Sequence, residues 1–259
     1  MTSFQIPESL VSRLSEPTTS KEDATWQCPT CGIQQPHSYT IKGVTYYGKR
    51  KCACQIAEEE RVAKEKQRLE MLEYYADQTY SWLGSRWSET TLRKKTFGSF
   101  QADRQPRAYK AAQIFATEPF GALILHGSFG TGKTHLLAAI CNETLHKHNR
   151  RSLFTTATKL FASIQQKIAD HGDYYRIIEM AIKTPLLVID DIDKAKWTEW
   201  REEQYFAIID ERVKLELPTA ISTNRVDELA NYVGGAVCSR LQIGQIAIEM
   251  TGEDFRKGL

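Results

Sequence analysis

The sequence predicts an α/β fold: a five-stranded parallel sheet preceded by a small cysteine-rich module and a charged linker helix. Short apolar runs of strand length alternate with longer amphipathic segments between residues 122 and 250. Strands without polar alternation are typical of parallel sheets that helices cover on both faces. Four of the six cysteines lie between residues 28 and 54, and clustered thiols in a reducing compartment are more often metal ligands than disulfides.

The composition is that of an ordinary globular protein. The 259 residues are 41% hydrophobic and 25% charged, with a net charge of +2, which excludes collagen-like and fully disordered classes. The longest apolar runs, residues 122–125 and 186–189, are far shorter than the ~18 residues of a membrane-spanning helix. No apolar segment follows a basic start in residues 1–13, so we expect a cytoplasmic protein with no membrane association.

Changes in composition divide the chain into four segments. Residues 1–25 are polar and are expected to be flexible, and residues 26–54 hold the cysteine module. Residues 55–95 are expected to form a charged helix and a linker, because residues 55–79 lack glycine and proline and are rich in Glu, Lys, Arg, Ala and Leu. Residues 96–259 form the domain of alternating strands and helices.

Two interpretations of the charged helix remain open. Intermixed Glu and Lys at i,i+4 spacing is typical of a solvated helix or linker. The alternative is a helix that binds a partner through Leu69, Leu72 and Tyr75.

The elements of the last segment follow from hydrophobic periodicity. In the helix predicted over residues 133–147, for example, Leu136, Leu137 and Ile140 share one face. The predicted strands are residues 122–126, 152–156, 186–190, 219–223 and 245–250, and the other predicted helices are residues 160–168, 175–182 and 205–215.

A glycine-rich loop links the first predicted strand to the helix that follows it. It matches G-x-x-x-x-G-K-[ST] in full, with the residues Gly127, Ser128, Phe129, Gly130, Thr131, Gly132, Lys133 and Thr134. The glycines let successive backbone N–H groups converge on phosphate oxygens, and the helix N-terminus favours the anion. We expect Lys133 to contact the β- and γ-phosphates and Thr134 to bind Mg²⁺. The loop therefore predicts ATP or another nucleoside triphosphate as the ligand.

Two aspartates follow the apolar run of residues 186–189. Ligands of open α/β sheets bind beyond the carboxyl ends of the strands, so a carboxylate at this position lies in the binding crevice. We expect Asp190 to hold Mg²⁺ and Asp191 to polarise the attacking water.

The next strand ends in Asn224, followed by Arg225, and two further arginines, Arg240 and Arg256, lie near the end of the chain. A strand that ends in an amide is suited to sensing a γ-phosphate or positioning its water, although asparagine also favours ordinary turns. Isolated arginines are mostly surface residues, so spacing alone assigns them no role.

The cysteine module has the spacing C-x₂-C-x₂₀-C-x-C, formed by Cys28, Cys31, Cys52 and Cys54. Two thiolates at x₂ spacing can chelate one metal ion, and four form a closed structural Zn²⁺ site. The second pair is closer together than is usual, so His37 is an alternative fourth ligand. Free structural thiols and a redox pair are the other interpretations.

The order and spacing of these motifs over residues 96–259 resemble those of the AAA+ ATPases, and within them the DnaC/DnaI-like helicase loaders. The matching stretches are residues 96–100, 126–137, 187–192, 222–224, 239–240 and 252–256. The resemblance implies that Asn224 is the sensor-1 residue, that Arg240 is an arginine finger reaching a neighbouring subunit, and that Arg256 is sensor 2. Arg225 is a rival for the finger. Since the chain ends soon after Arg256, we expect an AAA+ domain without the helical lid.

The resemblance implies an ATP-dependent loader that binds a hexameric replicative helicase and single-stranded DNA and self-associates through the ATPase domain. A zinc module followed by a charged helix is similar to the DnaI-type layout and implies docking onto the helicase or onto single-stranded DNA. Basic residues at 49–51, beside Tyr46 and Tyr47, and Lys159 and Lys167 are candidate contacts to DNA. The alternatives are a transposition helper ATPase and a nucleotide-gated adaptor with little turnover.

Overall fold

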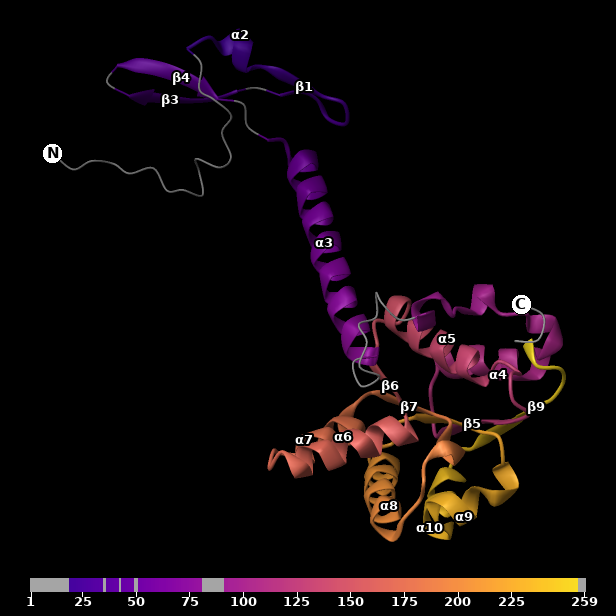
Figure 1. Ribbon diagram of the computed structural model, residues 1–259. Coiled ribbons are helices and arrows are strands. Elements are labelled where there is room, and N and C mark those ends of the chain that lie inside the picture. The colour runs from indigo at the N-terminus through magenta and orange to yellow at the C-terminus, as the bar shows by residue number, and fades with distance from the viewer. Residues whose placement is uncertain (1–18, 35, 42, 49–50, 81–90, 256–259) are drawn as a thin grey trace. The chain divides into compact units, whose positions relative to one another are not determined.

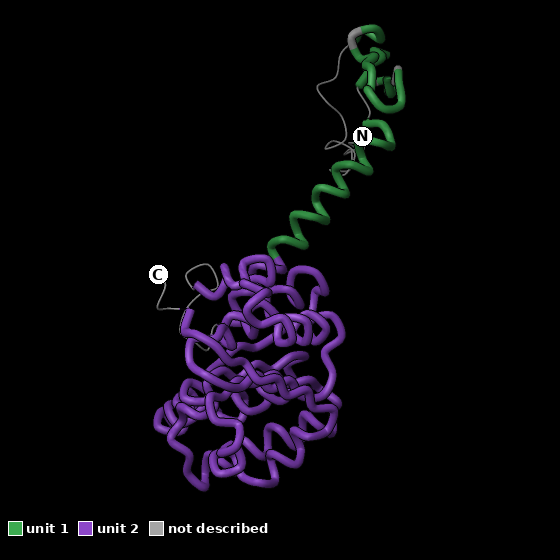
Figure 2. The backbone as a smooth tube through the Cα atoms, turned by 90° about the vertical axis from the view of Figure 1, so that its right-hand side faces the viewer, with its two compact units in different colours: residues 1–70 green, residues 71–259 purple. Residues whose placement is uncertain are grey.

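The computed structural model describes residues 19–34, 36–41, 43–48, 51–80 and 91–255. The chain divides into two compact units, residues 1–70 and residues 71–259 (Figure 1 and Figure 2). The expected flexible segment 1–25 and the expected linker after residue 80 lie largely outside the described residues, as does Arg256.

The first unit contains two short antiparallel hairpins and one short helix. Tyr39 and Tyr46 face each other across the second hairpin, with ring centroids 5.8 Å apart. Gly32 and Gly43 supply the positive φ angles of +82° and +81° near the turns. The elements are α2 (Lys21–Ala24), β1 (Trp26–Cys28), β2 (Gly32–Gln34), β3 (His37–Ile41) and β4 (Val44–Gly48).

Helix α3 (Ala53–Tyr80) is the charged helix that the sequence predicts. Residues 57–71 are all exposed, and its Glu, Lys and Arg side chains pair at i,i+3 and i,i+4, as in Glu58–Arg61. This supports the solvated interpretation for most of its length. The last two turns belong to the second unit, where Tyr80 is fully buried and donates to Asn142 Oδ1 at 3.0 Å.

The second unit contains a five-stranded sheet in the order β6-β7-β8-β5-β9. Each pair of neighbours is parallel, which confirms the predicted fold class. Every residue of β7 and β8 is buried, as expected for central strands covered on both faces. The strands are β5 (Ala122–Gly127), β6 (Ser152–Thr156), β7 (Leu186–Asp190), β8 (Thr219–Thr223) and β9 (Ile246–Met250).

Two apolar clusters pack on the two faces of this sheet. Because side chains alternate along a strand, Leu123 and Leu125 of β5 join one cluster and Ala122 and Ile124 join the other. Figure 1 shows α4 and α5 on the first face and α6 to α10 on the second. The helices are α4 (Pro106–Thr117), α5 (Lys133–His146), α6 (Ala157–Ala169), α7 (Tyr175–Lys183), α8 (Glu199–Lys214), α9 (Leu229–Val233) and α10 (Gly235–Leu241).

The structure extends some predicted helices and adds others. Helix α8 begins at Glu199, six residues before the predicted start at residue 205, because the Thr198 hydroxyl caps it by accepting from the Arg201 backbone N–H. Helices α4, α9 and α10 have no counterpart in the sequence analysis. Short 3₁₀ turns also occur at η2 (Thr91–Lys94), η3 (Phe97–Ser99), η4 (Ala102–Arg104), η5 (Ile192–Lys194) and η6 (Val226–Glu228). Among the described residues, no helix is long and apolar enough to cross a membrane.

Candidate nucleotide site and cysteine cluster

The glycine-rich loop connects β5 to α5 and has the backbone that its glycines permit. Gly127, Gly130 and Gly132 have φ angles of +118°, +72° and +95°, and a Cβ atom built at Gly127 would lie 2.3 Å from the Met250 carbonyl oxygen. The Thr131 hydroxyl donates to the Ser128 carbonyl at 2.9 Å, which closes the loop. The loop thus ends at the N-terminus of α5, a position that favours bound phosphate.

Lys133 is a buried cation at the centre of this loop. Its side chain is covered, and Nζ donates to the carbonyl oxygens of Gly127 and Ser128 at 2.8 and 2.7 Å. These two contacts hold the ammonium group against the loop that the phosphates are expected to enter. Lys194 Nζ lies 4.3 Å from the ring centroid of Phe129, the exposed aromatic side chain of the same loop.

Asp190 ends the buried strand β7 and lies beside the loop. It accepts a hydrogen bond of 2.5 Å from the Ser222 hydroxyl and another from the Thr134 hydroxyl. Burial and the negative charge of Asp191 raise the pKa of Asp190 to about 6, against the opposing effect of these hydrogen bonds. A carboxylate and a hydroxyl in contact provide the hard oxygen ligands that Mg²⁺ prefers, so the residues fit the cation.

Asp191 has an unusual backbone for a residue that is not glycine. Its φ of +51° lies in the left-handed region, a conformation that costs energy and is found most often at functional positions. The Asp191 N–H donates to Ser222 Oγ at 2.9 Å. Ser222 therefore contacts both predicted acidic residues, although sequence reasoning gave it no role.

Asn224 follows β8 and faces a third aspartate. Its backbone N–H donates to Asp193 Oδ1 at 3.1 Å, and its Nδ2 lies 2.9 Å from Asp193 Oδ2. Sequence reasoning also missed Asp193. The only signal for it was its place in the Asp190-Asp191-Ile192-Asp193 stretch.

Of the predicted arginines, Arg225 and Arg240 are described, and they lie at different places in the second unit. Arg225 is exposed and pairs with Glu228 at 3.1 Å. Arg240, on α10, donates to Asp210 at 2.6 Å and lines a 290 Å³ cavity with Gly121, Ala122 and Thr219. Gly121, Ala122 and Thr219 lie at the amino ends of β5 and β8. The glycine-rich loop of residues 127–134, called the phosphate loop from here on, follows the carboxyl end of β5. Arg240 therefore lies at the opposite end of the sheet from the loop of its own chain.

The last described residues lie against the phosphate loop. The Phe255 N–H donates to the Gly130 carbonyl at 3.1 Å, and a Cβ atom at Gly130 would lie 1.7 Å from Asp254 Oδ1. The Arg104 guanidinium covers the Phe255 ring at 4.8 Å. The stretch that precedes Arg256 is therefore part of the site.

The four clustered cysteines of the first unit come together in space. The sulfur atoms of Cys28, Cys31, Cys52 and Cys54 all lie within 4.8 Å of one another. A tetrahedral zinc site with Zn–S bonds of about 2.3 Å spaces its sulfurs by about 3.8 Å, so the cluster fits Zn²⁺. Among the described residues, His37 is not part of this group.

Hydrogen bonding favours the metal-binding form of one thiol. The backbone N–H groups of Cys31 and Thr30 lower the pKa of Cys28 to about 6, and the thiolate is the form that binds metal. Cys141 is buried in the second unit, and its burial raises the pKa of the thiol to about 12. It is a core residue.

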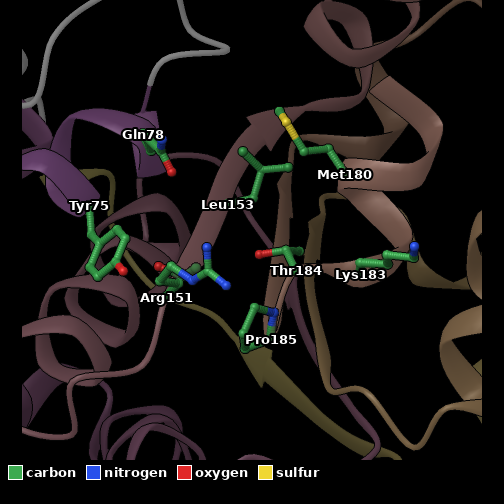
Figure 3. Close-up of a pocket in the computed structure, with 9 residues that line it drawn as sticks. Tyr75, Gln78, Arg151, Leu153, Met180, Lys183, Thr184 and Pro185 are labelled. Carbon is green, nitrogen blue, oxygen red and sulfur yellow. The ribbon is translucent and has the colours of Figure 1, made fainter. Parts of the chain in front are cut away.

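A further cavity, of about 300 Å³, lies beside the edge strand β6. Tyr75, Arg151, Leu153 and Met180 are among the residues that line it (Figure 3). The Arg151 guanidinium lies 5.3 Å from the Tyr75 ring centroid. None of the predicted nucleotide-binding, catalytic or metal-ligating residues lines this cavity, whereas Tyr75, a candidate partner contact of the charged helix, does.

Comparison with known proteins relates the second unit to replication ATPases. DnaI of Bacillus subtilis (strain 168), a replicative helicase loader, is 33% identical over 112 residues, 42% of this chain and 35% of DnaI. DnaC of Escherichia coli (strain K12), also a replicative helicase loader, is 28% identical over 149 residues, 56% of this chain and 60% of DnaC. The matches thus span less than two thirds of either relative.

Solved structures show the same relation. The crystal structure of DnaI superimposes with a TM-score of 0.54 and 28% identity, covering 61% of this chain and 94% of that chain. The predicted resemblance to DnaC/DnaI-like AAA+ proteins is thereby confirmed. The profile of the bacterial DnaA ATPase domain matches residues 92–248, more than half of the 259-residue chain. The chain therefore belongs to the bacterial DnaA ATPase domain family.

Proposed function

We propose that this protein is an ATP-dependent loader of a hexameric replicative helicase. One observation carries the proposal. A phosphate loop with a buried Lys133 lies beside the Thr134–Asp190 pair, in a chain whose relatives DnaI and DnaC are replicative helicase loaders.

Each site residue has a separate proposed role in ATP hydrolysis. The loop N–H groups and Lys133 bind the β- and γ-phosphates, and Thr134 and Asp190 hold Mg²⁺, which neutralises the charge that develops on the phosphate oxygens. Asp191 accepts the proton of the attacking water. Asn224, held by Asp193, contacts the γ-phosphate or its water.

Self-association completes the site. Arg240 lies near the amino ends of β5 and β8, and the phosphate loop lies beyond the carboxyl end of β5. A five- to six-residue strand spans roughly 17–20 Å, which is too far for one side chain to cross. This separation supports action of Arg240 on the triphosphate of a neighbouring copy, where an arginine finger stabilises the transition-state charge. Arg256 is proposed as sensor 2 because of the resemblance to AAA+ ATPases.

The first unit is proposed to dock onto the helicase, with Zn²⁺ held by its four cysteines. Such a metal is structural, because four protein ligands leave no open position for chemistry. Single-stranded DNA is proposed to contact the exposed Lys159 and Lys167 of α6, through the salt-dependent attraction between cations and phosphates.

The experiment that tests this function uses the full chain, the replicative helicase of the same cell and a forked DNA covered by single-strand-binding protein. The wild-type protein is expected to bind the helicase and to start unwinding when ATP is present. Lys133→Ala is expected to bind the helicase but to start no unwinding.

Two other results would contradict the proposal. Tight binding to duplex DNA without helicase binding would indicate a transposition helper ATPase. Full loading by Asp191→Asn would indicate a nucleotide-gated adaptor, because loading would not need hydrolysis.

A further inference from the structure

The turn after β7 carries an acidic residue that the phosphate-binding motifs do not include. Asp193, in η5, accepts three contacts from Asn224: the backbone N–H at 3.1 Å to Oδ1, and Nδ2 at 3.2 Å to Oδ1 and 2.9 Å to Oδ2. The Asp193 carboxylate thus accepts hydrogen bonds from both the backbone and the side-chain amide of Asn224, the residue that directly follows β8.

This contact selects one orientation of the amide. An ionised carboxylate only accepts hydrogen bonds, whereas an asparagine side chain has a donating nitrogen and an accepting oxygen. Asp193 therefore favours the rotamer in which Nδ2 faces it and Oδ1 faces away. A flipped amide would place its oxygen against the carboxylate, a repulsive contact. The orientation of Asn224 is fixed before any nucleotide contacts it.

A second contact ties the same two strand ends together. Ser222 Oγ accepts from the Asp191 N–H at 2.9 Å and donates to Asp190 Oδ1 at 2.5 Å. Asp191 thus lies between two cross-strand contacts, Ser222 on one side and Asp193–Asn224 on the other. Its left-handed backbone, with φ of +51°, needs such support because a residue with a Cβ atom adopts that conformation at a cost.

We propose that Asp193 is a positioning residue for ATP hydrolysis. It holds Asn224 in a single amide orientation and helps to hold the turn that carries Asp191. Lys133 donates to the carbonyl oxygens of Gly127 and Ser128 in the phosphate loop, so a change at Asp193 leaves these contacts in place and is expected to alter hydrolysis more than nucleotide binding. This inference rests on the proposed ATPase function.

The test compares full-chain variants for steady-state ATP hydrolysis and for binding of a fluorescent ATP analogue. Asp193→Ala is expected to lower kcat at least about tenfold, because a hydrogen bond to a charged group is lost, with less than about a twofold change in affinity for the analogue. Asp193→Asn keeps one accepting oxygen and the shape of the side chain, so it is expected to recover part of kcat. Asp193→Ala with Asn224→Ala is expected to be no slower than the slower single variant, because both changes remove the same contact.

Asp170→Ala is the matched control, since Asp170 is an exposed carboxylate that bonds only to Gln166 among the described side chains. It is expected to keep wild-type kcat. Wild-type kcat in Asp193→Ala, or losses that multiply in the double variant, would overturn the role of Asp193 while leaving the ATPase function in place. A wild-type chain that does not hydrolyse ATP would overturn the proposed function, and this inference with it.

Discussion

The two units of this chain differ in the interactions that stabilise each of them internally. The first unit has two hairpins of two strands each, and isolated two-stranded hairpins are marginally stable in water. The three apolar clusters of the described residues all lie between residues 72 and 250, in the second unit. We therefore expect the fold of the first unit to depend on its cysteine cluster, whereas apolar clusters stabilise the second unit.

The largest expected effect concerns chemistry in the second unit. Asp191→Asn keeps the size of the side chain but removes the base that accepts the proton of water. We expect ATP hydrolysis to fall by about 10⁴-fold, with Mg–ATP affinity close to that of the wild type. Steady-state hydrolysis and calorimetry measure the two quantities. Undiminished hydrolysis would show that Asp191 is not the base.

Metal removal separates the two units most directly. The native chain is expected to hold one Zn²⁺, measured by atomic emission, and Cys28→Ser is expected to hold none. A chelator should unfold the first unit and leave the unfolding midpoint of the second unit unchanged. Cys238→Ser, which changes a cysteine outside the cluster, is the control and should retain the metal. Equal metal content in both variants would contradict the assignment.

Arg240 tests whether the second unit acts alone. Arg240→Ala is expected to bind ATP as the wild type does. Its hydrolysis rate in the assembled state is expected to be about 10³-fold lower. Arg225→Ala is the matched control, because Arg225 is an exposed arginine paired only with neighbours on its own chain segment. If Arg225→Ala lost activity and Arg240→Ala did not, the finger would be Arg225.

The smallest expected effect is a pH dependence of magnesium use. Burial raises the pKa of Asp190 to about 6, so the residue is ionised at pH 7.5 and must lose a proton to bind Mg²⁺ below pH 6. The Mg²⁺ concentration for half-maximal hydrolysis should therefore rise, approaching tenfold per pH unit, as the pH falls below about 6. The Mg²⁺ affinity of ATP alone, measured at each pH, is the control. A constant midpoint between pH 5 and 7.5 would contradict this.

The sequence predicts the local features of this protein well. Short segments of strand length with an apolar centre identify all five strands of the sheet, and the spacing of Gly127, Gly132 and Lys133 identifies the loop, because both depend on residues close together in the chain. The four cysteines also meet as expected, although the close C-x-C spacing left His37 open as a ligand.

Contacts between distant segments could not be predicted in the same way. Asp193 and Asn224 are far apart in sequence and meet because β7 and β8 are neighbours in the sheet, an adjacency that hydrophobic periodicity does not give. The same holds for Ser222 and Asp190. Helix α4 was missed because three of its four buried residues are alanines, whose small side chains mark an apolar face less clearly than Leu or Ile.

The central claim is that the second unit binds Mg–ATP between its phosphate loop and Asp190. Isothermal titration calorimetry of the full chain with Mg–ATP tests it most directly, with Lys133→Ala as the comparison. We expect saturable binding of one nucleotide per chain to the wild type and a loss of at least about 100-fold in affinity for the variant. Equal affinity of the two proteins, or no heat of binding at millimolar nucleotide, would contradict it.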